Sequence, residues 1–219
     1  MVITIDGPAG AGKSSAARSL ARRLDFQFLD TGAMYRVVAY AAMQRGIPWD
    51  DDERLLALLE DIHIEEHDST VLLDGEDVSE AIRVMAVTRV IHHVADNAAI
   101  RGKLVDLQRV IAAGGNFVTE GRDQGTVAFP DATCKFFMTA SAEERARRRV
   151  HDLHRRGDVL PFDEVLRAQE ERDRRDRDRE VGGLVEAADA VRIDTEGLSL
   201  DEVVDRLEEI AREKCGLAV

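Results

Sequence analysis

The chain has 219 residues, of which 44% are hydrophobic and 33% are charged, and its formal net charge is -13 at pH 7. A chain of this length can bury one substantial core, which excludes intrinsic disorder as the first expectation and is ordinary for a soluble enzyme. An acidic surface repels phosphate, so the composition also argues against non-specific binding to nucleic acid or to an anionic membrane.

The two cysteines, Cys134 and Cys215, are isolated from each other and from any histidine cluster. Their spacing indicates neither a disulfide framework nor a zinc site and is typical of a reducing compartment. The start MVITIDG lacks the basic and long apolar segments of a signal peptide, and no later window approaches a membrane span. We therefore expect a cytoplasmic protein that has no membrane partner.

Short apolar runs alternate with helix-like stretches along the chain. This alternation predicts an α/β fold in which helices cover both faces of a parallel sheet. The predicted strands are VITI at 2–5, FQFL at 26–29, NFVTE at 116–120, CKFFMT at 134–139 and AVRID at 190–194.

Two regions interrupt this alternation, and the last helix carries a clear start signal. Residues 62–78 predict a small antiparallel hairpin, and the polar stretch 151–180 contains a turn sequence, RRGD, at 155–158. The final helix is expected to begin after Ser199, which is spaced to form a capping box with Glu202.

The stretch GPAGAGKSS at 7–15 satisfies the pattern G-x-x-x-x-G-K-[ST] and lies between a predicted strand and a predicted helix. There its glycines let backbone N–H groups converge on phosphate oxygens, and the helix dipole adds positive potential. Lys13 would reach the β and γ phosphates of a nucleoside triphosphate, and Ser14 would bind Mg²⁺. The alternative is a glycine-rich turn with a surface lysine. The residues expected to hold ATP are Gly7, Pro8, Ala9, Gly10, Ala11, Gly12, Lys13, Ser14 and Ser15.

Polar side chains follow two other predicted strands, at the sheet edge where open α/β sheets present their ligands. Glu120 ends one strand and is a candidate for the metal site, acting through water. DTGAMYR follows another and offers Thr31, Tyr35 and Arg36, a guanidinium fork with two neutral donors, which suits a second phosphate. The alternatives are a surface glutamate and a tight turn that caps an amphipathic helix.

GRDQGT at 121–126 supplies Arg122 and Asp123 at the same sheet edge, although a turn salt bridge explains this pair as well. EERDRRDRDRE at 170–180 consists entirely of charged residues. This run has two possible explanations. It is either a solvated helix with i, i+4 ion pairs or a segment in which some arginines face a multiply charged anion. The guanine-reading motif N-K-x-D of switch GTPases is absent from the sequence.

The stretches GPAGAGKSS, LDTGAMYR, GEDVSEAIR, EGRDQGTVAFPDA and ERDRRDRDR occur in this order across nearly the whole chain. This ordered set resembles the bacterial cytidylate kinases, P-loop nucleoside monophosphate kinases that act on CMP and dCMP. The resemblance implies a single P-loop kinase domain over 1–219, with a five-stranded parallel sheet, a small antiparallel monophosphate-binding insertion within 35–100 and a short helical lid at 151–180. It also implies a monomer that uses ATP with Mg²⁺ and transfers the γ-phosphoryl group to CMP or dCMP, giving ADP and CDP or dCDP.

The resemblance further implies roles for individual residues. Asp123 suits a contact with the base, because a carboxylate accepts from the 4-amino group of cytosine and repels the O4 of uracil. On a helix, Arg172, Asp176 and Arg179 would share one face at i, i+4 and i+7. Lys13, Arg122 and Arg179 are the expected catalytic residues. By position in the family motifs, Thr31, Tyr35, Arg36, Arg122 and Arg179 would hold the monophosphate, Arg101 and Asp123 the cytosine, and Arg172 and Asp176 the sugar.

His92 stands where this family usually has Ser near the base, which leaves cytosine selectivity open. Two other functions remain open: a P-loop kinase with another acceptor, such as UMP or a non-nucleotide metabolite, and a P-loop switch or regulatory ATPase. The arginines placed for a second anion argue against the switch. Nucleic-acid binding through 145–180 is disfavoured by the acidic total and by the lack of interleaved aromatic residues.

Overall fold

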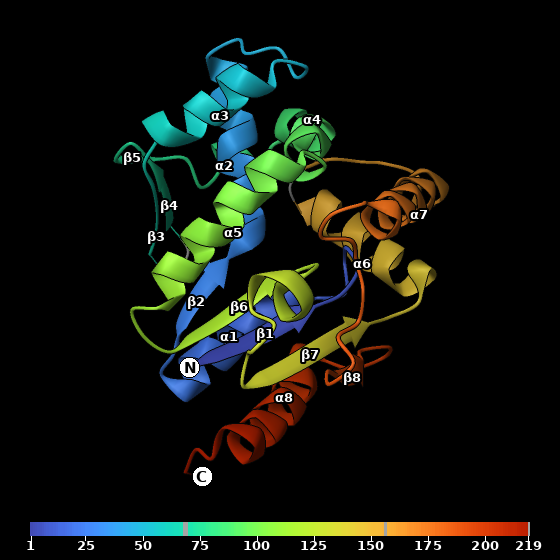
Figure 1. Ribbon diagram of the computed structural model, residues 1–219. Helices are drawn as coiled ribbons and strands as arrows, with labels where there is room; N and C mark the ends of the chain where they lie inside the picture. Colours follow the sequence, from blue (N-terminus) through green and yellow to red (C-terminus); the bar gives the residue numbers. More distant parts are fainter. Residues whose placement is uncertain (68–69, 156, 219) are drawn as a thin grey trace. The chain divides into compact units, whose positions relative to one another are not determined.

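The computed structural model describes residues 1–67, 70–155 and 157–218, and the chain divides into two compact units. The first unit comprises Met1–Phe28 and Gly115–Val219, and the second comprises Leu29–Gly114. Figure 1 shows the elements of both in chain order. The division of a single kinase domain into an insertion within 35–100 and a lid at 151–180 stays a prediction.

A five-stranded sheet has the strand order β2-β6-β1-β7-β8. In it β1 pairs with β6 and with β7, and β7 pairs with β8, all in parallel. The inner strands β6 and β7 are rich in apolar residues and mostly buried, as expected for a parallel sheet covered on both faces. All five predicted strands are therefore confirmed. Their bounds are β1 (Val2–Asp6), β2 (Gln27–Asp30), β6 (Phe117–Gly121), β7 (Cys134–Thr139) and β8 (Val191–Asp194).

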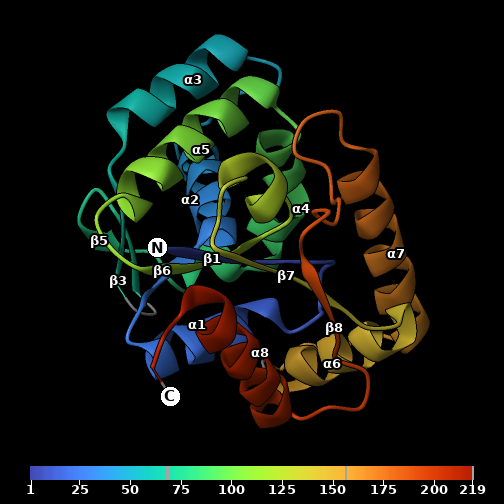
Figure 2. The same ribbon diagram turned by 60° about the horizontal axis from the view of Figure 1, so that its bottom comes forward.

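Two helices, α1 (Lys13–Leu24) and α8 (Leu200–Cys215), lie side by side on one face of the sheet (Figure 2). Their apolar residues join those of the strands in the main core, where Leu20, Phe136 and Leu207 are almost fully buried. Burial of one such side chain contributes about 1.5–3 kcal/mol. The predicted capping box at the start of α8 is present, so the helix begins where the sequence indicates.

A second pair of helices, α6 (Ala142–Arg155) and α7 (Phe162–Asp178), follows β7 and packs together. A small apolar cluster around Ala146, Leu153 and Val165 lies between them. The turn predicted at 155–158 falls between these helices, and its Arg156 lies outside the described residues. Apart from Val165, the buried residues of α7 are polar, so beyond this apolar cluster the helix packs through polar contacts.

The described residues of the second unit form four α-helices, a short 3-10 turn and a three-stranded antiparallel sheet of order β3-β4-β5. The sheet confirms the antiparallel hairpin predicted within 62–78, of which residues 68–69 lie outside the described residues. Among the described residues, no helix combines the length and apolar character needed to cross a membrane. The bounds are α2 (Thr31–Gln44), α3 (Asp52–Asp61), β3 (Ile64–His67), β4 (Thr70–Leu73), β5 (Glu76–Asp77), η1 (Ala81–Arg83), α4 (Met85–Ala95) and α5 (Ala98–Ala112).

Candidate active site

The loop at residues 7–12 joins β1 to α1, and its shape depends on glycine. Gly7 has a φ of 146°, and a Cβ there would lie 2.0 Å from the carbonyl oxygen of Met138. Gly12 is the N-cap of α1 and provides no side-chain hydrogen bond to the helix. The first amide groups of α1 and its dipole therefore favour an anion at this point. The predicted strand, loop and helix are confirmed, whereas phosphate binding stays a prediction.

Lys13 begins α1 and is buried, with only 5% of its surface exposed. Its Nζ donates to the carbonyl oxygen of Pro8 at 2.9 Å, so the side chain folds back over the loop. Burial lowers the pKa of Lys13 to about 7; the charges of Arg122 and Arg172 lower it as well, and Glu120 opposes them. A bound polyphosphate would favour the charged form, so this lysine is suited to an anionic ligand.

Ser14 and Glu120 provide two oxygen groups beside the loop. The Ser14 hydroxyl donates to Oε1 of Glu120 at 2.9 Å, and Glu120 is buried near the end of β6. Mg²⁺ prefers such oxygen ligands and usually keeps several waters, so one or two protein groups beside substrate phosphates are enough. These residues therefore fit Mg²⁺. Within the described residues, no group of three or more His, Cys, Asp or Glu side chains is placed to hold a metal ion.

The turn after β6 carries Arg122 and Asp123 and is anchored to the end of β1. The carboxylate of Asp6 accepts from the backbone N–H of Gln124 at 2.9 Å and from that of Gly125 at 2.7 Å. Burial raises the pKa of Asp6 to about 6, even though both hydrogen bonds oppose the rise. Asp6 was not among the residues expected from the sequence, although a carboxylate directly before the glycine loop was an available signal.

Arg122, Asp176 and Arg179 form a largely buried ion cluster. Nε of Arg122 donates to Oδ2 of Asp176 at 2.8 Å, and Nη2 of Arg179 donates to Oδ1 of Asp176 at 2.9 Å. Burial by itself would raise the pKa of Asp176, but the charges of Arg122, Arg172 and Arg179 bring it down to about 2. Asp176 is thus a permanent carboxylate that fixes the orientation of two arginines.

The expectation that Arg172, Asp176 and Arg179 share a helix face at i, i+4 and i+7 is wrong. The helix α7 ends at Asp178, and Arg179 is extended, with φ of -62° and ψ of 129°. The chain turns back at this point because the N–H of Leu184 donates to the carbonyl oxygen of Asp176 at 2.8 Å. Arg179 therefore reaches Asp176 from beyond the end of the helix.

Tyr35 and Arg101 come together in the second unit. The guanidinium carbon of Arg101 lies 5.3 Å from the centroid of the Tyr35 ring, within the range of a cation–π contact. Nη1 of Arg101 donates to the carbonyl oxygen of Ala95 at 3.0 Å. Thr31 is the first residue of α2 and is buried, and the helix is capped by the Asp30 side chain. The helix cap proposed as the alternative for DTGAMYR is therefore present.

Arg36 is directed toward η1 and α4. Its Nη1 donates to the carbonyl oxygen of Ile82 and to Oγ1 of Thr88, each at 3.0 Å. His92 on α4 lies against His93, with ring centroids 4.0 Å apart, and His93 stacks on Trp49.

The predicted site residues thus form two groups, one in each unit. The first is Lys13, Ser14, Glu120, Arg122, Asp123, Arg172, Asp176 and Arg179, and the second is Thr31, Tyr35, Arg36 and Arg101.

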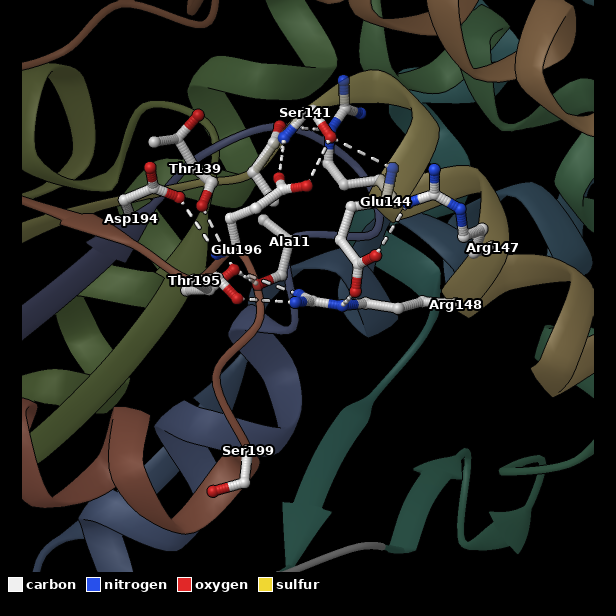
Figure 3. Close-up of polar contacts among 12 residues, drawn as sticks. Ala11, Thr139, Ser141, Glu144, Arg147, Arg148, Asp194, Thr195, Glu196 and Ser199 are labelled. Carbon is white, nitrogen blue, oxygen red and sulfur yellow. Dashed lines mark hydrogen bonds and ion pairs between the residues drawn. The ribbon is translucent and has the colours of Figure 1, made fainter.

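A polar cluster that was not expected from the sequence surrounds Thr195, the residue after β8 (Figure 3). Arg148 of α6 donates to Oγ1 of Thr195 at 3.0 Å and to its carbonyl oxygen at 2.7 Å. The Thr195 hydroxyl points toward two carbonyl oxygens, that of Thr139 at 3.1 Å and that of Ala11 at 3.5 Å. Since Ala11 belongs to the loop, this cluster supports the loop from α6. No motif around Thr195 marked it in the sequence.

Asp176→Asn is expected to change how stability depends on acid. A carboxyl whose pKa is about 2 in the folded protein and 3.8 when unperturbed, as in the unfolded chain, stabilises the fold above pH 3.8, and this stabilisation is lost as pH falls toward 2. The gap corresponds to about 2 kcal/mol. Urea midpoints measured between pH 7 and pH 2 should therefore fall less steeply for the variant than for the wild type. Asp178→Asn, at an exposed site on the same helix, is the control; parallel curves for Asp176→Asn and the wild type would contradict the expectation.

Comparison with known proteins identifies the family. A family model for cytidylate kinase matches residues 3–213. A cytidylate kinase from Rhodopirellula baltica is 52% identical over 97% of this chain and 93% of its own length, and one from Desulfitobacterium hafniense is 46% identical over 97% and 93%. The structure of a gluconokinase from Sinorhizobium meliloti matches 99% of this chain and 94% of its own with a TM-score of 0.50 and 19% identity, a likeness of fold alone. The chain belongs to the cytidylate kinase family.

Proposed function

We propose that the protein is an ATP-dependent cytidylate kinase that transfers the γ-phosphoryl group of ATP to CMP or dCMP, giving ADP and CDP or dCDP. The observation that carries this proposal is the match to the cytidylate kinase family over nearly the whole chain. The loop at residues 7–12, the buried Lys13 and the largely buried cluster of Arg122, Asp176 and Arg179 support it, because phosphoryl transfer needs groups that hold and neutralise phosphate.

ATP binds at residues 7–15, where the first turn of α1 and Lys13 face its phosphates. The Lys13 ammonium leaves the Pro8 carbonyl and donates to phosphate oxygens instead. Asp123 accepts from the 4-amino group of cytosine and so favours it over uracil. CMP is bound by Thr31, Tyr35, Arg36, Arg101, Arg122, Asp123, Arg172, Asp176 and Arg179.

The reaction is an in-line attack of a CMP phosphate oxygen on the γ phosphorus of ATP. This oxygen is already an anion, so the chain needs no general base. Lys13, Arg122 and Arg179 orient the reacting groups and stabilise the negative charge that moves toward the bridging oxygen. Mg²⁺, held by Ser14 directly and by Glu120 through water, would neutralise phosphate charge when bound.

A panel of acceptors tests the function directly. ADP release is measured with Mg-ATP and each of CMP, dCMP, UMP, AMP, GMP and shikimate. Activity confined to CMP and dCMP is the expected result and means that His92 is compatible with cytosine selectivity. Equal use of UMP would retain the kinase and overturn Asp123 as the discriminating group, and no activity with any acceptor would overturn the proposal in favour of a switch or regulatory ATPase.

We further propose that the enzyme works as a cytoplasmic monomer and uses no nucleic acid. Both thiols, Cys134 and Cys215, are free in the structure, which supports a reducing compartment. The net charge of -13 supports the absence of a nucleic-acid partner. Light scattering coupled to size exclusion, in the presence and absence of an oligonucleotide, measures the mass of the particle and so tests the monomeric state and the absence of a nucleic-acid partner.

A further inference from the structure

Arg145, near the start of α6, is buried and contacts acceptors in three segments. Its Nε donates to the carbonyl oxygen of Ala140 at 3.1 Å, and its Nη1 donates to that of Ala9 at 2.9 Å. Nη1 also lies 2.6 Å from Oδ2 of Asp173 on α7. A planar guanidinium can serve several acceptors in fixed directions, as a lysine cannot. Since Ala9 belongs to the phosphate loop, Arg145 links that loop to α7.

Asp173 lies inside the charge run at 170–180 and is only 2% exposed. Within the part of the chain that the structure describes, its second oxygen, Oδ1, has no hydrogen-bond partner. The desolvation cost of a buried ion pair often exceeds its attraction, so stability alone is a weak reason for such a pair. The exposed arginines of the same run, Arg174 and Arg177, show that burial here is selective.

Gln169 adds a second contact between α7 and the loop. It lies one turn before Asp173, and its Nε2 donates to the carbonyl oxygen of Arg145 at 3.4 Å. A Cβ at Gly10 would lie 2.6 Å from this Nε2 and 3.2 Å from Cβ of Arg145, and Gly10 has a φ of 80°. The loop, α6 and α7 are therefore in direct contact, and the positive φ of Gly10 favours glycine where they meet.

The buried polar face of α7 consists of Gln169, Asp173 and Asp176, which are spaced i, i+4 and i+7. Asp173 holds Arg145, and Asp176 holds Arg122. Although burial opposes it, the charges of Asp176 and, more weakly, Asp173 raise the pKa of Arg122. One helix face thus contacts both the loop for the phosphoryl donor and an arginine assigned to the acceptor.

We infer that Arg145 and Asp173 are positioning residues whose ion pair holds α7 in fixed register with the phosphate loop. In that register the acceptor arginines stay aligned with the phosphoryl donor. This inference rests on the proposed kinase function, and neither residue contacts the reacting atoms. Without the pair, ATP still binds, but misalignment slows transfer to CMP and lets water compete for the γ-phosphoryl group.

Asp173→Asn tests the inference, because it keeps the size of the side chain and removes its charge. We expect kcat to fall about 10- to 100-fold. The ratio of CDP formed to ADP formed should drop below one, while KM for ATP changes little. The matched control is Glu171→Gln on the same helix, which removes an exposed acid paired with Arg175 at 3.3 Å and should leave rate and ratio unchanged.

A double variant, Arg145→Met with Asp173→Leu, separates positioning from stability. Replacing a buried pair by apolar residues of similar volume often preserves stability, so the thermal midpoint should stay near the wild-type value. The ratio of CDP to ADP should nevertheless remain low, because Ala9 loses its donor. Arg145→Lys, which keeps the charge but cannot serve all three acceptors, should show a smaller defect of the same kind.

Two results would overturn the inference: a wild-type CDP to ADP ratio and kcat per folded molecule in Asp173→Asn, or full recovery of both in the double variant. If Asp173→Asn does not fold, the double variant and Arg145→Lys decide the matter. Wild-type enzyme assayed with CMP in parallel keeps the two proposals apart. Failure of the wild type to form CDP would contradict the kinase function. A variant that keeps the wild-type ratio of CDP to ADP, measured beside an active wild type, would contradict only the positioning role.

Discussion

Lys13→Met is expected to lower CMP phosphorylation by at least about 100-fold, since one well-placed charged donor to a transition state contributes that much or more. The methionine keeps most of the length and volume of lysine but cannot donate to phosphate. Steady-state rates with saturating Mg-ATP and CMP measure this loss. A variant that retains a near-normal rate would contradict the assignment of residues 7–15 as the ATP loop.

The same substitution is expected to stabilise the unliganded protein near neutral pH. Burial lowers the pKa of Lys13 from 10.5 to about 7, so the folded protein binds this proton more weakly than the unfolded chain does. The resulting destabilisation is greatest below pH 7 and disappears as pH rises to 10.5. Between these two pKa values it decreases by about 1.4 kcal/mol for each pH unit. The stabilisation by Lys13→Met should therefore be a few kcal/mol at pH 6.5 and shrink steadily by pH 9.5.

Denaturation midpoints at several pH values measure this effect, with the exposed Lys103→Met as the control. The control should change stability little and show no trend of this kind. A difference between Lys13→Met and the wild type that stays constant from pH 6.5 to pH 9.5 would contradict the low pKa. Calorimetry of ATP binding at pH 8 in buffers of different ionisation enthalpy should also detect proton uptake in the wild type and none in Lys13→Met.

The sheet and the glycine-rich loop at residues 7–12 could be predicted because their signals are local. Each strand is a short apolar run bounded by turn residues. The glycines before Lys13 occupy backbone conformations that favour glycine, and their spacing within the motif indicates this. The contact of Gly7 with Met138 was not predictable, because it joins segments far apart in the chain. A motif thus indicates that a glycine is needed before the structure shows what approaches it.

The charge run at 170–180 shows where prediction from sequence fails. A segment with no apolar residue has no hydrophobic periodicity, so the sequence does not indicate which side faces inward. The structure buries Asp173 and Asp176, because Arg145 and Arg122 from other elements neutralise them. The sequence suggested that some of these arginines face inward, and Arg179 does, since its side chain pairs with Asp176. Within the helix itself, however, the buried residues of the run are acidic, and the exposed ones include Arg174, Arg175 and Arg177.

The end of α7 was missed for a related reason. The Arg and Glu residues of the run have good helix propensity, and no Gly or Pro interrupts it, so the sequence supports extending the helix through Arg179. The hydrogen bond from Leu184 back to Asp176 ends it earlier, and that contact depends on the close turn at Gly183. Arg179 still meets Asp176, with Nη2 donating to Oδ1 at 2.9 Å, although the helical spacing that placed the two residues on one face does not hold.

Arg122→Met is expected to reduce kcat/KM for CMP by about 1,000-fold while KM for ATP changes little. The side chain both serves the acceptor phosphate in the proposed mechanism and donates to Asp176 at 2.8 Å and to the carbonyl oxygen of Gly121 at 3.2 Å. Its loss removes a charge-assisted contact to phosphate and loosens Asp176. Since Arg179 still pairs with Asp176, we expect a loss of stability of no more than about 3 kcal/mol, less than for a carboxylate left without any partner.

Arg122→Lys distinguishes charge from geometry. An ammonium restores the charge but cannot reproduce donation to Asp176, Gly121 and a phosphate together, so the rate with CMP should recover only in part. Arg147→Met, at an exposed position of α6, is the control and should leave both substrates unaffected. Initial rates with each substrate varied in turn give the two KM values, and thermal midpoints give the folded fraction.

If KM for ATP and KM for CMP rise together in Arg122→Met, the residue supports the whole fold of the first unit and is not specific to the acceptor. A rise confined to CMP, with partial rescue by lysine, requires that Arg122 act on the acceptor phosphate while Asp176 fixes its direction.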